Sequence, residues 1–105
     1  MYRIVQTEWF EKQYEKLSGS EQRIVESIKN RLVENPRIGD ILRHPMVREM
    51  RVRDKRLYFL VFEEWLAVLI VWIGDKKAQQ KTINTILYML PDYRKKMREK
   101  ITLLF

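Results

Sequence analysis

Arginine and lysine side chains cluster at two places that the sequence pattern predicts to be ends of a small antiparallel sheet. Arg51 and Arg53 belong to a basic strand expected over residues 46–53. Lys76 and Lys77 follow directly after a later strand. Guanidinium and ammonium groups pair well with phosphate oxygens. The arrangement therefore suits a phosphate chain that lies across the sheet and is held by cations at both ends.

The same side chains also have a purely structural interpretation. Glu49 shares one strand face with Arg51, because alternate residues of a strand point to the same side, and the two can form a local ion pair. Arg56 can pair with Asp54 across the turn. Lys76, by contrast, falls in an expected first helical turn, where the helix dipole disfavours a cation, and this favours a functional role. The sequence leaves both interpretations open.

Length and charge narrow the class of protein. The chain has 105 residues, of which 46% are hydrophobic, so it forms one domain with a modest core. Its net charge is +7 and its pI is about 9.8. A strongly basic domain favours an anionic partner, either a nucleic acid or an acidic protein.

Several kinds of site are excluded or disfavoured by composition. The chain has no cysteine, so it forms no disulfide and no cysteine-ligated metal site, and its one histidine is His44. We expect no metal and no cofactor. The longest apolar run, residues 65–73, is far shorter than the roughly 20 residues that a membrane-spanning helix needs. The first residues show no secretory pattern, and we expect a soluble, cytoplasmic protein.

Hydrophobic periodicity predicts an α+β domain in the order β-α-α-β-β-β-α-α. It has a small antiparallel sheet, an N-terminal helical hairpin and C-terminal helices. Thr7 is expected to cap the first helix of the hairpin. The segment Ser18-Gly19-Ser20 is expected to end that helix and cap the second, which ends at Asn35-Pro36. The expected later segments are an ordered crossover over 36–45, strands over 46–53, 56–62 and 66–73, and helices over 75–90 and 92–104 separated by Pro91.

This element order and the hairpin over residues 51–58 resemble the RelE/ParE toxin superfamily. In that family a strand ending Arg-Val-Gly-Asp-Tyr-Arg-Val-Ile-Tyr is typical, and Arg51, Asp54 and Arg56 match it in place. Arg53 stands where the glycine usually lies. Lys76 falls on an arginine that commonly follows the later strand. The resemblance covers about residues 2–77 of a single domain spanning 1–105, and residues 75–105 form a C-terminal helical extension.

The resemblance implies a RelE-like mRNA interferase of a toxin–antitoxin system. RelE-type toxins inhibit translation by cutting messenger RNA on the ribosome without a metal, through attack of the RNA 2′-hydroxyl on the adjacent phosphate. Arg51 and Arg56 would then clamp the phosphate, Lys76 would add positive charge and Glu49 would act as the base. The general acid has no assignment. Further RNA contacts are expected from Arg48, Arg53, Lys55, Lys77, Arg94 and Lys95.

Two alternatives stay open at this stage. RelE-type ribonucleases usually carry a tyrosine just after the late basic residue, and residues 77–80 contain none. A ParE-like toxin shares the fold but inhibits DNA gyrase and cuts nothing, and a third class is a non-catalytic binding module. The expected partners of a toxin are a small RelB-like antitoxin, the ribosome and mRNA. The apolar tail over 101–105 is a candidate for partner contact, for homodimer formation or for closing the core.

Overall fold

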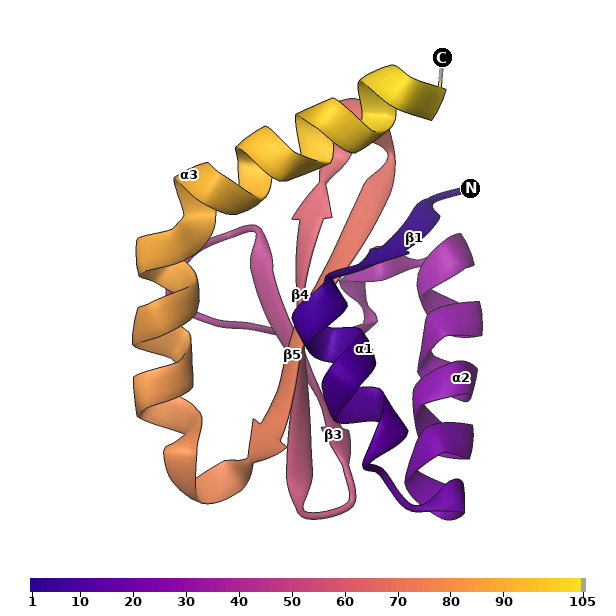
Figure 1. The fold of residues 1–105 in the computed structure, drawn as a ribbon, viewed down its shortest axis with the longest axis vertical. Helices are drawn as coiled ribbons and strands as arrows, with labels where there is room; N and C mark the ends of the chain where they lie inside the picture. The colour runs from indigo at the N-terminus through magenta and orange to yellow at the C-terminus, as the bar shows by residue number, and fades with distance from the viewer. Residues whose placement is uncertain (105) are drawn as a thin grey trace.

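A computed structural model describes residues 1–104 of the chain, and Figure 1 shows its α+β arrangement. The elements in chain order are β1 (Arg3–Gln6), α1 (Glu8–Glu15), α2 (Gly19–Glu34), η1 (Pro36–Ile38), β2 (Asp40–Ile41), β3 (Val47–Val52), β4 (Lys55–Phe62), η2 (Glu63–Trp65), β5 (Ala67–Asp75), η3 (Lys76–Ala78) and α3 (Gln79–Leu104). The predicted fold class is therefore confirmed. No helix within residues 1–104 combines the length and the apolar character needed to cross a membrane.

The sheet has five strands in the order β1-β5-β4-β3-β2. The four later strands pair antiparallel, as predicted for the three strands expected over residues 46–73, whereas β1 pairs parallel to β5. The expectation of a wholly antiparallel sheet is therefore wrong in this detail. A parallel neighbour requires a long crossover connection, and a strand's own pattern does not reveal which distant strand it joins. The short strand β2 lies within the segment that was expected to be an ordered crossover.

The helical hairpin α1–α2 begins each helix with a capping residue that the sequence predicted. The Thr7 hydroxyl accepts a hydrogen bond from the Phe10 backbone N–H at 3.0 Å. Ser18 and Glu21 form a reciprocal capping box, in which each side chain accepts a hydrogen bond from the other's backbone N–H. These local hydrogen bonds satisfy donors that a helix N-terminus otherwise leaves free, so the helix starts are fixed by nearby residues.

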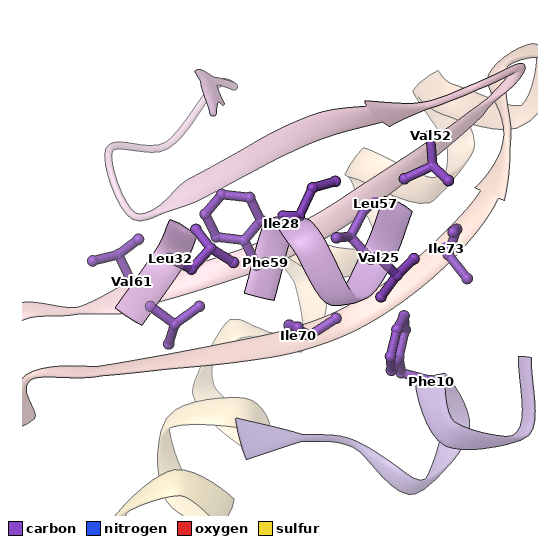
Figure 2. Close-up of a cluster of buried hydrophobic side chains, with 11 residues drawn as sticks. Phe10, Val25, Ile28, Leu32, Val52, Leu57, Phe59, Val61, Ile70 and Ile73 are labelled. Atoms are coloured by element: carbon purple, nitrogen blue, oxygen red, sulfur yellow. The ribbon is translucent and has the colours of Figure 1, made fainter. Parts of the chain in front are cut away.

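The hairpin packs on one face of the sheet and buries the first hydrophobic cluster (Figure 2). The fully or almost fully buried side chains of this cluster are Phe10, Val25, Ile28, Leu32, Val52, Leu57, Phe59, Val61, Val68, Ile70 and Ile73. Helix α3 covers the other face over a second cluster, which includes Tyr58, Leu60, Ile83, Ile86 and Met97. Strands β4 and β5 are thus buried on both faces, and continuous apolar runs such as theirs are typical of strands in this position.

Pro91 does not separate two helices, as the sequence had indicated, but lies inside the single helix α3. Figure 1 shows that α3 changes direction near its middle, so its first half runs along the sheet and its second half crosses the sheet's end. A proline inside a helix removes one N–H donor and clashes with the preceding turn, and it therefore bends the helix. The sequence identified the position of the disturbance and overstated its extent.

The turn between β3 and β4 consists of two residues, Arg53 and Asp54, rather than the expected three. Arg53 adopts a left-handed backbone conformation with φ of 56°. Tight hairpin turns favour glycine where φ is positive, because a Cβ atom makes this region costly for other residues. Arg53 replaces the glycine of the RelE/ParE pattern. It therefore occupies a position whose backbone conformation favours glycine.

Candidate active site

Two arginines face each other at the hairpin end of the sheet. Arg51 on β3 is directly opposite Arg56 on β4, and Arg56 is opposite Gly74 on β5. Opposite residues on antiparallel strands point to the same face, so both guanidinium groups belong to the face that α3 covers. The Lys76 backbone N–H donates to the Asp54 carbonyl oxygen at 3.4 Å, which holds the start of η3 beside the hairpin turn. The structure therefore brings these three basic residues to one end of the sheet.

The two arginines differ in burial. Arg56 is only 8% exposed, and its Nη1 donates a hydrogen bond to the Lys55 carbonyl oxygen at 3.2 Å. Arg51 is exposed on the neighbouring strand. A buried guanidinium held by the backbone is preorganised, because it has little freedom to lose when an anion binds. The pair thus combines one fixed cation with one that is free to reach toward an anion.

Glu49 lies on the same face, two residues before Arg51. Its carboxylate accepts hydrogen bonds from the side-chain amide of Gln79 at the start of α3, at 3.0 Å and 2.8 Å to its two oxygens. The contact joins residues 30 positions apart in the chain and fastens the first turn of α3 to β3. Glu49 is half-buried there. The two hydrogen bonds from Gln79 fix the orientation of its carboxylate.

Tyr58 completes the cluster beneath Glu49, its cross-strand partner. The residue is fully buried, and within the described residues its hydroxyl has no hydrogen-bond partner. Burial, and to a lesser degree the Glu49 carboxylate, raise the pKa of Tyr58 to about 12, and Arg56 opposes the change. The phenol is therefore protonated at neutral pH.

We expect Tyr58→Phe to raise the free energy of unfolding at neutral pH by up to about 1 kcal/mol, because it removes a buried hydroxyl that has no partner. The folded-state pKa of Tyr58 lies above its ordinary value of 10.0. Ionisation of the phenol is therefore less favourable in the folded protein than in the unfolded chain, and it lowers the free energy of unfolding as the pH rises above 10 toward about 12. Urea unfolding at neutral pH and at about pH 11 should show a smaller alkaline loss in the variant. Destabilisation of the variant at neutral pH would show that the hydroxyl is hydrogen-bonded.

Arg48 and Lys55 lie away from this cluster, on the face that α2 covers. Arg48 Nη1 donates to the Gly39 carbonyl oxygen at 2.8 Å, which ties β3 to the segment before β2. Lys55 Nζ pairs with the Glu21 carboxylate at 2.6 Å. This ion pair raises the pKa of Lys55 and lowers the pKa of Glu21. Both cations thus already have partners within the fold.

The remaining predicted RNA contacts are dispersed. Arg94 pairs with Glu64 at 3.3 Å and stacks over the rings of Phe62 and Trp65, at 5.4 Å and 5.8 Å from their centroids. These contacts fasten the second half of α3 to η2, where Trp65 is half-buried. The other three residues, Arg53 at the hairpin turn, Lys77 in η3 and Lys95 on α3, are exposed.

One residue of the cluster, Gln79, was not predicted from the sequence. Gln79 gave no local signal, because its role depends on a contact with a distant strand. Across residues 1–104 no three histidine, aspartate or glutamate side chains gather in a way that would hold a metal ion.

Solved structures of toxins from two bacteria resemble this chain. A chain of the intact E. coli RelBE toxin–antitoxin complex is 22% identical with a TM-score of 0.65, over 71% of this chain and 96% of that one. The isolated E. coli RelE toxin is 19% identical with a TM-score of 0.65, over 82% and 99% of the two chains. The protein has the RelE fold. The M. tuberculosis RelBE2 toxin–antitoxin complex contains a RelE-like neighbour that is 22% identical with a TM-score of 0.56, over 71% and 98%.

Neither a family model nor a curated protein matches the sequence. Identities this low establish the RelE fold alone, so the chemistry rests on the cluster itself. In this RelE-like sheet, the two arginines and Glu49 lie together at the hairpin end, covered in part by Gln79. The similarity predicted from the sequence pattern is confirmed at the level of fold.

Proposed function

We propose that this protein is the toxin of a toxin–antitoxin system and acts in the cytoplasm as a ribosome-dependent mRNA endoribonuclease. The observation that supports it is the pairing of Arg51 with the buried Arg56, on the same face as Glu49, within a RelE fold. A RelB-like antitoxin would hold the activity in check. RelE structures with RelB support this partner by analogy.

The reaction is the metal-independent cleavage of an RNA phosphodiester. The 2′-oxygen forms a bond to the adjacent phosphorus, the bond from phosphorus to the 5′-oxygen breaks, and a 2′,3′-cyclic phosphate and a 5′-hydroxyl result. Negative charge grows on the phosphate oxygens in the transition state, and preorganised cations stabilise it. Arg56 supplies the fixed cation and Arg51 the mobile one, while Lys76 lies near enough in the fold to add charge.

Glu49 is the base in this proposal, since it is the carboxylate on the face that carries both arginines. Gln79 orients the carboxylate and leaves lone pairs on both oxygens to accept the proton of the 2′-hydroxyl. Tyr58 lies buried beneath Glu49 and supports it without contact to the RNA. The leaving oxygen takes a proton from solvent in this proposal, and no side chain is assigned as the general acid.

A non-catalytic RNA-binding module is the second candidate, and the Gln79 contact favours it. Gln79 donates hydrogen bonds to both oxygens of Glu49, so its amide competes with an RNA 2′-hydroxyl for the carboxylate. A module that only binds RNA would keep the arginines and need no base. The two functions differ in whether transcripts are cut.

The deciding experiment is induced expression in bacterial cells followed by primer extension on abundant transcripts. Growth arrest with discrete cuts inside translated codons, relieved by co-expression of an antitoxin, is expected. Growth arrest without transcript cuts would contradict the ribonuclease function and indicate a gyrase inhibitor of ParE type. Absence of both arrest and cuts would leave the RNA-binding module.

A further inference from the structure

The hydroxyl of Tyr58 is a buried polar group that the fold itself does not use. Within residues 1–104 it is the only buried side-chain oxygen or nitrogen without a hydrogen-bond partner. Burial takes away the hydrogen bonds to water, so an unpaired hydroxyl destabilises the folded state. A phenylalanine ring would fill the same space without this cost. Unpaired buried groups in native proteins call for a specific explanation, and a catalytic role is one of them.

Two charged groups of the candidate active site lie beside this hydroxyl. Glu49 on β3 is directly opposite Tyr58, and side chains in such pairs have Cβ atoms roughly 4.5–5.5 Å apart. Arg56 precedes Tyr58 by two positions on β4, so both side chains point to the same face. Burial and the Glu49 carboxylate raise the pKa of Tyr58, and Arg56 opposes the change, so both charges act on the phenol. The hydroxyl is thus next to the proposed base and to the fixed cation of the phosphate clamp.

The hydroxyl matches both charged neighbours in its hydrogen-bonding capacity. An ionised carboxylate only accepts hydrogen bonds and a guanidinium only donates them, whereas a hydroxyl does both. Gln79 occupies only part of the acceptor capacity of the Glu49 carboxylate. The Lys55 carbonyl oxygen accepts from Nη1 of Arg56, and the guanidinium has further N–H donors. Tyr58 can therefore donate to Glu49 and accept from Arg56 at the same time.

A β-bulge beside Tyr58 is a second, independent observation. Tyr58 is opposite Trp72 on β5, whereas the next residue, Phe59, is opposite Ile70, so the register skips Val71. Val71 and Trp72 both pack in the second cluster, although consecutive residues of a regular strand point to opposite faces. Bulges redirect side chains and are frequent next to active sites. The sheet is therefore irregular at the residue that carries the unpaired hydroxyl.

We propose that Tyr58 is a positioning residue of the ribonuclease, whose hydroxyl donates to Glu49 and accepts from Arg56 when RNA occupies the site. This inference rests on the proposed function. Arg56 then binds the phosphate and Glu49 faces the 2′-hydroxyl, so the phenol that bridges them fixes the base relative to the cation. Such positioning matters because a displacement of about 1 Å in an active site can lower a rate about 100-fold. Tyr58 itself touches no RNA and transfers no proton.

This role explains why the protein keeps a hydroxyl that destabilises its free form. The oxygen of Tyr58 is unpaired in the free protein, and its two hydrogen bonds form only in the complex with RNA. Interactions that become stronger on the way to the transition state increase the rate, whereas interactions of constant strength do not. Removal of the oxygen should therefore stabilise the free protein and slow cleavage. A role in packing alone would instead lower stability and cleavage together.

The test compares the full-length wild type with Tyr58→Phe, which removes one oxygen and leaves the ring in place. Tyr93→Phe is the matched control, because Tyr93 packs against the same second cluster from the second half of α3. Single-turnover cleavage over a range of programmed-ribosome concentrations separates the maximal rate from the apparent affinity. Urea unfolding of the free proteins measures their stability.

We expect Tyr58→Phe to lower the maximal cleavage rate about 10- to 100-fold, the usual loss for a hydrogen bond to a charged group. Its apparent affinity for the programmed ribosome should change less than about threefold, because Tyr58 touches no RNA. The urea midpoint of the variant should equal or exceed that of the wild type. Tyr93→Phe should cleave within about threefold of the wild-type rate.

The opposite results would overturn the proposal. Cleavage by Tyr58→Phe at the wild-type rate would exclude the positioning role and leave the ribonuclease function standing. A lower urea midpoint in Tyr58→Phe would show that the hydroxyl has a structural role. A loss confined to affinity, or an equal loss of rate in Tyr93→Phe, would also contradict the positioning role. Absence of cleavage by the wild type would instead refute the ribonuclease function, and the role of Tyr58 with it.

Discussion

Replacement of Arg56 by lysine is expected to lower the rate of ribosome-dependent mRNA cleavage by about 10²- to 10³-fold, the usual cost of losing one preorganised donor in an active site. Lysine keeps the charge but lacks the planar fork that pairs with two phosphate oxygens. The buried guanidinium of Arg56 is fixed by the Lys55 carbonyl oxygen, so a shorter, flexible ammonium does not reproduce its position. Single-turnover cleavage on programmed ribosomes measures the effect directly.

Arg98→Lys on the exposed side of α3 is the matched control and should cleave at the wild-type rate. Because Arg56 is buried, each variant also needs a thermal melt to show that it is folded. Arg51→Lys gives an independent test, since Arg51 is exposed and its replacement leaves the core untouched. Folded Arg56→Lys and Arg51→Lys proteins that both cleave normally would contradict the phosphate clamp.

Much of this fold could be predicted from the sequence, because it depends on interactions between residues that are close in the chain. The helix caps at Thr7 and Ser18 use hydrogen bonds between residues three positions apart, and both form as predicted. The central strands were recognised because continuous apolar runs fit strands that are covered on both faces. Alternation along β3 separated Arg48 from Arg51, and the structure places them on opposite faces.

What the sequence did not reveal depends on contacts between distant residues. The parallel pairing of β1 with β5 joins strands about 60 residues apart in the sequence. The pattern of residues 3–6 does not indicate with which strand β1 pairs. The hydrogen bonds from Gln79 to Glu49 depend on how α3 packs against the sheet. Pro91 marked a disturbance, yet packing of both halves of α3 on the sheet keeps one bent helix where local preference indicated two.

Replacement of Phe59 by alanine is expected to lower the free energy of unfolding by about 3–5 kcal/mol, because it removes a fully buried ring and leaves a cavity. Figure 2 shows the Phe59 ring on β4 among the side chains of the first cluster, near Leu32 of α2. The ring also packs closely on Gly39, where an added Cβ atom would lie 2.8 Å from its Cζ atom. The lost contacts therefore involve both a helix and the segment that leads into β2.

Urea unfolding of Phe59→Ala and of Leu103→Ala, an apolar truncation at an 86% exposed residue, gives the comparison. The Leu103 variant should remain within about 0.5 kcal/mol of the wild type, since surface substitutions rarely exceed this. A loss below about 1 kcal/mol in Phe59→Ala would show that the cluster is not tightly packed around the ring.

The two predictions separate a chemical from a structural cause of lost toxicity. Domains of this size are stable by only about 5–15 kcal/mol, so the Phe59 change would remove a large share of the free energy of unfolding and reduce the protein's abundance in cells. Arg56→Lys would reduce cleavage while the protein level stays constant. Growth arrest, protein level and transcript cleavage measured together in both variants therefore assign lost toxicity either to the arginine pair or to the core that positions it.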